Sequence, residues 1–402
     1  MNIGMVSEHA SPLAVLGGAD AGGQNVHVAE LSNTLAAMGH RVTVYTRRDA
    51  RRLPERVVMP GGTVVVHVDA GPPETVPKDG LFAHMDEFAH NLRRHLSRAR
   101  HDVVHAHFWM SGYATLLAAR RLGVPVVQTF HALGSEKRRF QGEQDTSPAE
   151  RLAVELRVMR AADFVIATST SELFELVRLG AESSRVRVVP CGVDLGFFDA
   201  APSAYDVARR LPYRIVTLSR LVERKGIADV VAALRGLRDT ELLIGGGGGD
   251  TGAEERRLAQ IARDEGVAAR VHFAGAVPRE RVPAFLRSAD VVVCTPWYEP
   301  FGIVPLEAMA CAVPVVASSV GGLNDTVVDG VTGYHVAPRS PGQTAYAVRA
   351  LLESAKLRSN FGQRGRRRVQ ARYTWRRIAQ ATLDVYSGLT AACRPASVHR
   401  TA

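Results

Sequence analysis

Two glutamates flank a predicted turn in the second half of the chain. Glu299 and Glu307 stand eight positions apart, shortly after the apolar run Val291–Cys294. Ligands bind beyond the carboxyl ends of strands in an open parallel sheet, so we expect Glu299 at such a crevice. Pro305 suits the first turn of a helix that we expect to begin near Ile303, where free backbone N–H groups attract phosphate. Acids that hold sugar hydroxyls beside an anion-binding helix start indicate a nucleotide-sugar site, although the spacing alone also fits a loop acid and a surface acid.

Two cations follow an earlier predicted strand in the same half of the chain. Arg220 and Lys225 come directly after the strand Arg214–Leu218 and open the next predicted helix. In that position they would neutralise a leaving diphosphate. The sequence contains no Asp-x-Asp, the acid pair with which other sugar transferases bridge a metal ion, so we expect no metal. The alternative for Lys225 is a solvated lysine at a helix start, although only four of the 50 basic residues are lysines.

Short runs rich in valine and isoleucine alternate with amphipathic stretches along the whole chain. Runs that are apolar throughout are typical of parallel strands buried on both faces by helices. The predicted strands of the first half are Asn2–Ser7, Arg41–Thr46, Thr63–Val68, Asp102–Ala106, Pro125–Thr129, Phe164–Ala167 and Arg185–Val189. Those of the second half are Arg214–Leu218, Glu241–Ile244, Val271–Phe273, Val291–Cys294 and Pro314–Ala317. We therefore expect an α/β protein with two doubly wound, Rossmann-like domains that face each other across a cleft.

A segment rich in glycine, aspartate and proline, Pro190–Pro212, divides the chain. We expect an N-terminal domain over residues 1–200 and a C-terminal domain over residues 201–372. Residues 373–402 should form a last helix, with apolar positions from Trp375 to Tyr386, and a frayed polar tail. The pattern leaves open whether this helix lies on the second domain or crosses back to the first.

The composition excludes several classes of protein. The 402 residues are 46% apolar and 22% charged, an ordinary globular balance. No apolar run is long enough to cross a membrane, and the N-terminus lacks the pattern of a signal peptide. The four cysteines form no C-x-x-C pair, so we expect free thiols and a cytoplasmic protein. The net charge of +10 comes from arginines that we assign to solvated helix faces rather than to nucleic-acid binding.

Taken together, these motifs resemble a known enzyme family. The chain looks like a family 4 retaining glycosyltransferase with the GT-B fold, and the resemblance covers nearly its whole length. It rests on the Glu299/Glu307 element, on the Arg220/Lys225 pair and on the glycine loop Gly22-Gly23-Gln24-Asn25. Within that family the chain is most similar to the branch of the mycothiol-pathway inositol-phosphate N-acetylglucosaminyltransferase and the sucrose-phosphate synthases.

The resemblance implies a donor site and a reaction. It gives catalytic roles to His131, Glu299, Lys225 and Arg220, and donor contacts to Gly23, Arg220, Lys225, Glu299, Phe301, Gly302, Ile303 and Glu307. The cations would bind the diphosphate, Glu299 the transferred sugar and Glu307 the ribose. The implied reaction moves a hexose or N-acetylhexosamine from a nucleotide sugar, with uridine as the expected base, and retains the anomeric configuration. The leaving phosphate oxygen would help to deprotonate the acceptor, so we assign no catalytic base and expect no cofactor.

The resemblance also implies an acceptor site, with two departures from the family pattern. Asn25, Lys78 and Arg151 match acceptor ligands of the inositol-phosphate enzyme. Phe108 and Ala132 stand where that enzyme has a tyrosine and a threonine, so two hydroxyl donors to an acceptor phosphate are missing. We therefore expect a different cyclitol, sugar or sugar phosphate as the acceptor. The oligomeric state stays open, with a dimer as one candidate.

A nicotinamide-dependent oxidoreductase is the main alternative function. It would use the same doubly wound sheets, and Gly247, Gly249 and Gly252 form one G-x-G-x-x-G. A single match of this kind is weak, and the acid expected at the end of the next strand is absent.

Two further alternatives fit parts of the sequence. A metal hydrolase would use His105, His107 and His131, which lack the spacing of an established metal motif. A non-catalytic sugar-binding protein would keep the cleft but would have no use for the cations and glutamates.

Overall fold

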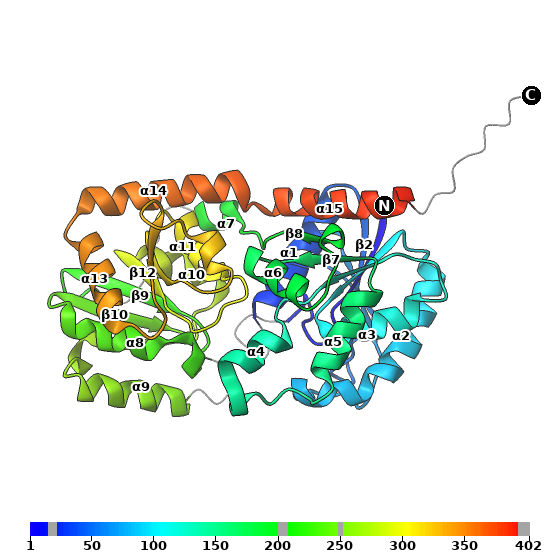
Figure 1. Cartoon of the computed structure of the whole chain (residues 1–402), viewed down its shortest axis with the longest axis horizontal. Coiled ribbons are helices and arrows are strands. Elements are labelled where there is room, and N and C mark those ends of the chain that lie inside the picture. Colours follow the sequence, from blue (N-terminus) through cyan, green and yellow to red (C-terminus); the bar gives the residue numbers. More distant parts are fainter. Residues whose placement is uncertain (15–21, 200–207, 248–251, 393–402) are drawn as a thin grey trace, which may run out of the picture.

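Two sheets of almost entirely parallel strands form the framework of the protein. The computed structural model describes residues 1–14, 22–199, 208–247 and 252–392. The first sheet has the order β3-β4-β2-β1-β5-β6-β7-β8, and the second has the order β11-β10-β9-β12-β13-β14. Only β3 pairs antiparallel with its neighbour among the described strands. Figure 1 shows the two sheets in separate halves of the molecule, each flanked by helices.

The strands are short, and their side chains alternate between two cores. The first sheet contains β1 (Asn2–Val6), β2 (Arg41–Arg47), β3 (Arg56–Val58), β4 (Val64–Val68), β5 (Val103–His107), β6 (Val126–Thr129), β7 (Phe164–Ala167) and β8 (Val186–Val188). The second contains β9 (Tyr213–Leu218), β10 (Thr240–Gly245), β11 (Val271–Gly275), β12 (Val291–Cys294), β13 (Val315–Ser318) and β14 (Gly333–Val336). In β12, Val292 packs into one core, whereas Val291 and Val293 pack into another. This burial on both faces explains the uninterrupted apolar runs.

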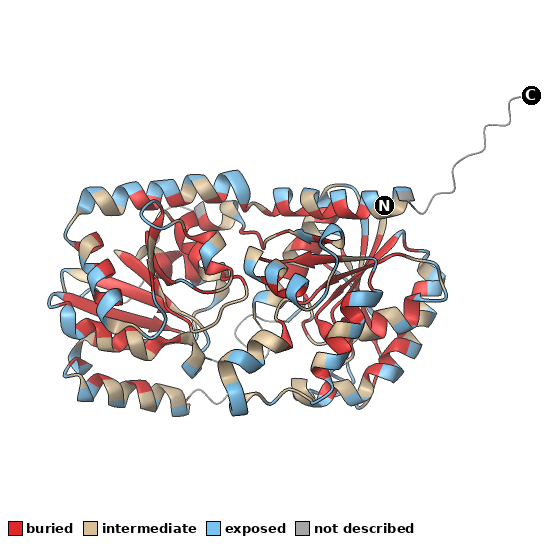
Figure 2. Ribbon diagram, viewed as in Figure 1, coloured by how far each residue is buried: buried red, intermediate tan, exposed pale blue. Residues whose placement is uncertain are grey.

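Helices cover both faces of the first sheet. They are α1 (Gly23–Ala37), α2 (Met85–Ala99), α3 (Trp109–Ala119), α4 (Gly134–Gln141), α5 (Arg151–Ala161) and α6 (Thr170–Arg178). Phe88 of α2 and Val158 of α5 pack in the core on one face. Val28 and Leu35 of α1 pack in the core on the other. Figure 2 shows the buried residues concentrated in the strands and on the inner sides of these helices.

The second sheet is covered in the same way. Its helices are α8 (Ile227–Ala233), α9 (Gly252–Asp264), α10 (Val282–Arg287), α11 (Ile303–Ala310), α12 (Leu323–Thr326) and α13 (Pro341–Leu352), with the short α7 (Leu195–Asp199) before the first strand. Val230 of α8 and Val348 of α13 lie in the core on one face, whereas Phe285 of α10 and Leu306 of α11 lie in the core on the other.

The last two helices join the two halves. α14 (Ala355–Arg372) and α15 (Trp375–Ala392) run end to end along one side of the molecule (Figure 1). Ile378 of α15 shares a core with α1, and the Tyr386 hydroxyl lies 2.7 Å from Nδ1 of His105 in the first sheet. Between the halves, the Val193 N–H donates to the Tyr373 carbonyl at 2.7 Å. The chain passes from one half to the other near Val193 and again near Tyr373, and a hydrogen bond joins these two segments. The last helix lies on the first sheet.

The α/β prediction with two parallel sheets is confirmed, and the twelve predicted strands lie within two residues of their expected bounds. The sequence analysis missed β3 and β14, which are edge strands of three and four residues without a continuous apolar run. The domain boundary expected near residue 200 and the expected frayed tail fall mostly outside the described residues. No described helix is both long and apolar enough to span a membrane.

Candidate active site

A cavity of about 420 Å³ lies between the two sheets. Of the residues predicted from the sequence, those that line it are Gly23, Asn25, Lys78, Phe108, His131, Arg151, Arg220, Lys225, Glu299, Phe301, Gly302 and Ile303. Glu307 is buried and does not reach the lining. The fold therefore brings side chains from distant parts of the chain to one cavity.

A lysine–glutamate ion pair stands on the second-sheet side of the cavity. β9 and β12 are neighbours in the sheet, so the segments that leave their carboxyl ends lie side by side. Lys225 follows β9, Glu299 follows β12, and their Nζ and Oε2 atoms form a hydrogen-bonded ion pair. Burial alone would raise the pKa of Glu299. The positive charges of Lys225, Arg224 and Arg220 have the larger effect and hold this pKa below its ordinary value. Glu299 is thus an ionised carboxylate among three cations.

Gly226 fixes the backbone beside Lys225. Its φ of +66° lies in the left-handed region, and an added Cβ would sit 1.9 Å from the Thr295 carbonyl oxygen. We expect Gly226→Ala to lower stability by several kcal/mol, because strain and a backbone clash add. Gly123→Ala is the matched control, since Gly123 has a φ of +65° with no atom near its Cβ, and should cost only about 1 kcal/mol. Urea unfolding measures both, and equal losses would contradict the packing role of Gly226.

The N-termini of two helices lie next to each other in the cavity lining. α11 begins at Ile303, as the position of Pro305 predicted, after Gly302 at a φ of +84°. α1 begins at Gly23, and a Cβ added there would lie 3.2 Å from the Ile303 side chain. Helix N-termini present free N–H groups and positive dipole ends, so their convergence favours an anion between them.

Glu307 is held by a residue that the sequence analysis did not single out. It lies one turn into α11, and its Oε1 accepts a hydrogen bond from Arg279, which follows β11. The Arg279 guanidinium also lies 5.0 Å from the ring centres of Phe197 and Phe198 in α7. Glu307 is consequently anchored in one orientation beneath the cavity.

The first-sheet side of the cavity carries an aromatic ring between two cations. The Phe108 ring lies 4.8 Å from Lys78 Nζ and 5.3 Å from the Arg151 guanidinium. Burial, together with the charges of Arg151, Lys137 and Arg220, lowers the pKa of Lys78 to about 8. In the described part of the chain, no hydrogen bond or ion pair engages the Lys78 ammonium. An anion in this part of the cavity would raise the pKa of Lys78 again.

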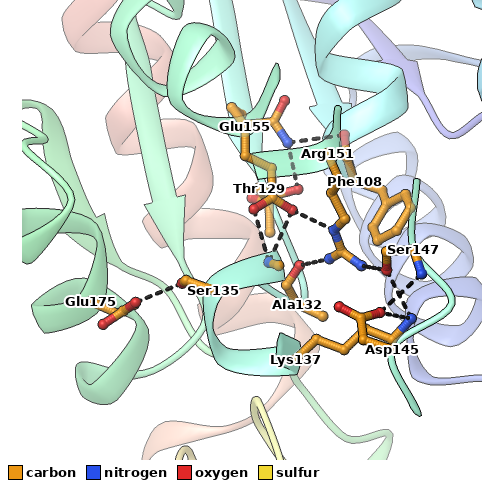
Figure 3. Close-up of polar contacts among 12 residues, drawn as sticks. Phe108, Thr129, Ala132, Ser135, Lys137, Asp145, Ser147, Arg151, Glu155 and Glu175 are labelled. Carbon is orange, nitrogen blue, oxygen red and sulfur yellow. Dashed lines mark hydrogen bonds and ion pairs between the residues drawn. The ribbon is translucent and has the colours of Figure 1, made fainter. Parts of the chain in front are cut away.

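Arg151, by contrast, is held by protein groups (Figure 3). Its Nε donates to Glu155 at 2.8 Å, its Nη1 to the Ser147 hydroxyl at 3.1 Å and its Nη2 to the Ala132 carbonyl at 2.7 Å. Lys137 is similarly paired with Asp145 at 2.9 Å. These contacts leave Lys78 as the cation here that a ligand would most readily recruit.

Asn25 supports the glycine loop. Its Oδ1 accepts from the Gly22 N–H and its Nδ2 donates to the Ser11 carbonyl, both at 3.0 Å. This side chain caps the start of α1 while it lines the cavity. Both of its side-chain polar atoms are therefore engaged by backbone groups of the protein.

Three buried histidines, His27, His105 and His107, lie close to the half-buried His131 of the cavity lining. His131, at a φ of +61°, places Nε2 3.0 Å from Nδ1 of His107. Burial lowers the pKa of each, to about 4 for His27 and about 3 for His105, so all are neutral near pH 7. The backbone of His131 costs strain energy, and Phe108, at a φ of +83°, shares this property. Both strained residues line the cavity, and strained backbone is typical of functional sites. We therefore expect the functional part of the first sheet at this cavity.

Three of these histidines form the one group among the described residues that could hold a metal ion. Ligand atoms of His27, His107 and His131 lie within 4.8 Å of one another, and His107 Nε2 is buried without a hydrogen-bond partner. His27 was not singled out from the sequence, because a histidine inside an amphipathic helix carries no local signal. The hydrogen bond between His107 and His131 accounts for two of the three side chains without a metal.

Two family models match the chain: Glycosyltransferase Family 4 over residues 21–197 and Glycosyl transferases group 1 over residues 209–368. The D-inositol 3-phosphate glycosyltransferase of Acidothermus cellulolyticus is 37% identical over 419 residues, which cover 100% of this chain and 93% of that protein. The chain belongs to this glycosyltransferase family. The D-inositol 3-phosphate glycosyltransferase of Kineococcus radiotolerans is also 37% identical, over 96% of this chain and 94% of its own length.

Solved structures agree with this assignment. The sucrose-phosphate synthase of Thermosynechococcus elongatus superposes with a TM-score of 0.89 at 31% identity, over 98% of this chain and 100% of that one. Anabaena HepE, solved in complex with UDP-glucose, shares the fold with a TM-score of 0.75 at 18% identity, over 96% of this chain and 100% of that one. The predicted GT-B fold and the recognised family are confirmed.

The two halves of the glycosyltransferase touch at the rim of the cavity. The Phe140 ring of α4 stacks on Tyr298 at 5.2 Å with an angle of 13° between the rings. The Thr170 N–H at the start of α6 donates to Asp325 Oδ2 at 2.6 Å. These contacts join the two halves of the molecule near the cavity.

Several residues of this site escaped the sequence analysis. Arg279 follows β11 and His9 follows β1, so both stand beyond carboxyl ends of strands, the signal that had singled out Arg220. Neither residue belongs to a motif that would set it apart from other residues that follow strands. Tyr298 lies inside the motif segment, but its partner Phe140 comes from the other half, and a sequence does not reveal such a pairing.

Proposed function

We propose that this glycosyltransferase moves a hexose or N-acetylhexosamine from a UDP-sugar to a hydroxyl of a small acceptor, with retention at the anomeric carbon and without a metal ion. The partly buried Lys225–Glu299 pair, which lines the same cavity as two helix N-termini, carries this proposal. Fixed positive charge of this kind would stabilise a departing diphosphate. A cytoplasmic location is part of the same proposal.

The donor would bind on the second-sheet side. Lys225 and Arg220 would hold the diphosphate together with backbone N–H groups at Phe301, Gly302 and Ile303, a region that the two helix starts make positive. Glu299 would accept hydrogen bonds from hydroxyls of the transferred sugar, and Glu307, oriented by Arg279, would take the ribose. Gly23 leaves room for the phosphate, because even a methyl group there would press against the Ile303 side chain.

The charges on the cavity lining support retention by a same-face route. Glu299 is the one carboxylate among the described lining residues, and Lys225 is already paired with it. A double displacement would need a free carboxylate nucleophile, and a bridging metal would need oxygen ligands beyond this one. His131 would contact the donor sugar near the reacting carbon.

The acceptor would bind beside Phe108, Lys78, Arg151 and Asn25. The names of the relatives and of the sucrose-phosphate synthase refer to small phosphorylated molecules. Lys78, which lacks a hydrogen-bond or ion-pair partner in the described part of the chain, favours an acceptor with one negative group. Phe108 offers an apolar ring instead of a hydroxyl donor. We therefore favour a sugar phosphate over an uncharged cyclitol or sugar.

A mass-spectrometric screen tests this function. UDP-, GDP- and ADP-sugars would be incubated with pooled sugar phosphates, sugars and cyclitols, with and without EDTA. We expect transfer from a UDP-sugar at equal rates in both conditions, and an anomeric NMR signal of unchanged configuration in the product. Loss of turnover with EDTA and its return with magnesium would contradict the metal-independent mechanism. Thermal stabilisation by NAD, without stabilisation by any nucleotide sugar, would instead favour an oxidoreductase.

A further inference from the structure

Helix α6 begins where the two halves of the molecule meet. A helix leaves its first N–H groups without a partner inside the helix. In α6 the Ser169 hydroxyl accepts one of them, from Glu172, at 3.2 Å. Another, the Thr170 N–H, donates to Asp325 Oδ2 in the second half at 2.6 Å. A carboxylate of the second half therefore completes the start of a helix in the first half, where the helix dipole also favours it.

A second hydrogen bond runs beside the first. The Ser171 hydroxyl donates to the Gly321 carbonyl at 3.1 Å. Gly321 and Asp325 are the two ends of one short piece of chain, the bridging segment (residues 321–325), so this segment is attached to α6 at both ends. Asp325 itself stands outside the cavity lining.

The bridging segment also packs on the Glu299 loop (residues 295–302). The Gly322 N–H donates to the Glu299 carbonyl at 3.1 Å. A Cβ added to Gly321 would sit 2.1 Å from the same carbonyl oxygen, and one added to Gly322 would sit 2.5 Å from Phe301 Cα. With backbone against backbone at these distances, a shift of the bridging segment would move the Glu299 loop as well.

The second half holds Asp325 by its backbone. The Asp325 carbonyl accepts from the Tyr373 hydroxyl at 2.9 Å and from Arg368 Nη2 at 2.5 Å. The Tyr373 carbonyl in turn accepts the Val193 N–H, where the chain passes between the halves. Because the backbone of Asp325 is fixed in one half and its side chain is bound in the other, this residue fixes the position of the two halves relative to each other.

The proposed reaction depends on that relative position. The transferred sugar would be held by Glu299 in the second half, whereas the acceptor would be held by Lys78 and Phe108 in the first. A bond forms between the two substrates only when they meet in the right geometry, and a misplacement of about 1 Å costs about 100-fold in rate. A contact that fixes the Glu299 loop relative to the first sheet therefore affects transfer.

We propose that Asp325 is a positioning residue for sugar transfer. Through its bond to the start of α6 it holds the Glu299 loop, and with it the transferred sugar, in line with the acceptor on the first sheet. This inference rests on the proposed transferase function and adds to it a residue that touches neither substrate. Hydrolysis of the donor by water needs no positioned acceptor, so loss of Asp325 should affect transfer far more than hydrolysis.

The ratio of transfer to hydrolysis tests this role. UDP-glucose would be supplied with the pooled sugar phosphates of the screen, and separately with water alone. Asp325→Ala should lower transfer by about 10- to 100-fold, hydrolysis by less than about threefold, and UDP affinity by less than about twofold. Asp325→Asn should restore most of the ratio, because its amide oxygen still accepts the Thr170 N–H. A merely structural role would lower transfer and hydrolysis together.

Asp329→Ala is the matched control for this experiment. Asp329 Oδ1 also accepts a backbone N–H, from His335 at 2.8 Å, but both residues belong to the second half. The control variant therefore loses the same kind of hydrogen bond without changing a contact between the halves, and its ratio of transfer to hydrolysis should equal that of the wild-type protein.

Hydrogen exchange of the Thr170 amide tests the contact without any substrate. We expect slow exchange in the wild-type protein and in Asp329→Ala, and exchange at least about tenfold faster in Asp325→Ala. Equal exchange in all three proteins, or a wild-type ratio of transfer to hydrolysis in Asp325→Ala, would overturn the proposal.

Two further results decide the remaining cases. If Asp325→Ala does not fold, Ser171→Ala removes the neighbouring hydrogen bond and should lower the same ratio about threefold, and an unchanged ratio would count against the proposal. If the wild-type protein transfers no sugar while its Thr170 amide is protected, the transferase function is wrong and the positioning role falls with it, although the contact itself is supported.

Discussion

Lys225→Met should lower kcat for sugar transfer by about 100- to 1000-fold, because one fixed charge that stabilises the leaving diphosphate is removed. The same change leaves the partly buried Glu299 without its ion-pair partner, so the free energy of unfolding should also fall, by about 2 kcal/mol. Initial rates with the donor found in the screen and urea unfolding measure the two effects. Lys356→Met, an exposed lysine of α14, is the control and should change neither.

A double variant separates the two effects. Lys225→Met combined with Glu299→Gln removes both charges, so most of the lost stability should return. Activity should stay as low as in the single variant, because the double variant lacks both Lys225, which would bind the diphosphate, and Glu299, which would bind the transferred sugar. Recovery of activity together with stability would mean that Lys225 supports only the fold.

Stability should fall steeply as the pH drops from 6.5 towards 4. Burial lowers the pKa of His27 from 6.5 to about 4, and that of His105 to about 3, with His107 and His131 lowered as well. In this range the unfolded chain binds protons that the folded protein does not, so acid favours unfolding. The full effect for His27 alone is about 3 kcal/mol at 1.36 kcal/mol per pH unit. Above pH 7 the free energy of unfolding should not change with pH on account of these histidines.

Urea unfolding at pH 7.5, 6.0 and 5.0 measures this dependence. His27→Phe should flatten part of the slope, because the phenyl ring fills a similar space and does not titrate. His90→Gln should leave the slope unchanged, since that side chain is exposed in the folded protein. A free energy of unfolding that stays constant between pH 7.5 and 5.0 would contradict the buried, neutral state of the histidine cluster.

Local sequence was sufficient for the framework and for one side of the site. Uninterrupted valine-rich runs located the buried parallel strands, because a strand covered on both faces can expose no polar side chain. Pro305 predicted the start of α11 at Ile303, and the position of Lys225 and Glu299 after strands predicted that both face the cavity. Short edge strands such as β14 were missed, because four residues with a glycine and a histidine among them form no continuous apolar run.

By itself, the sequence determined which residue types stand at the carboxyl ends of the strands, and hence the class of chemistry. Only the tertiary structure decided which of them meet and which are already engaged. Arg279 anchors Glu307, and Arg151 is held by Glu155, whereas Lys78 and the ring of His9 face the cavity. The residues of each pair are brought together by the folded sheets and helices. Which charges are neutralised by a partner therefore depends on tertiary packing, which a local sequence pattern does not contain.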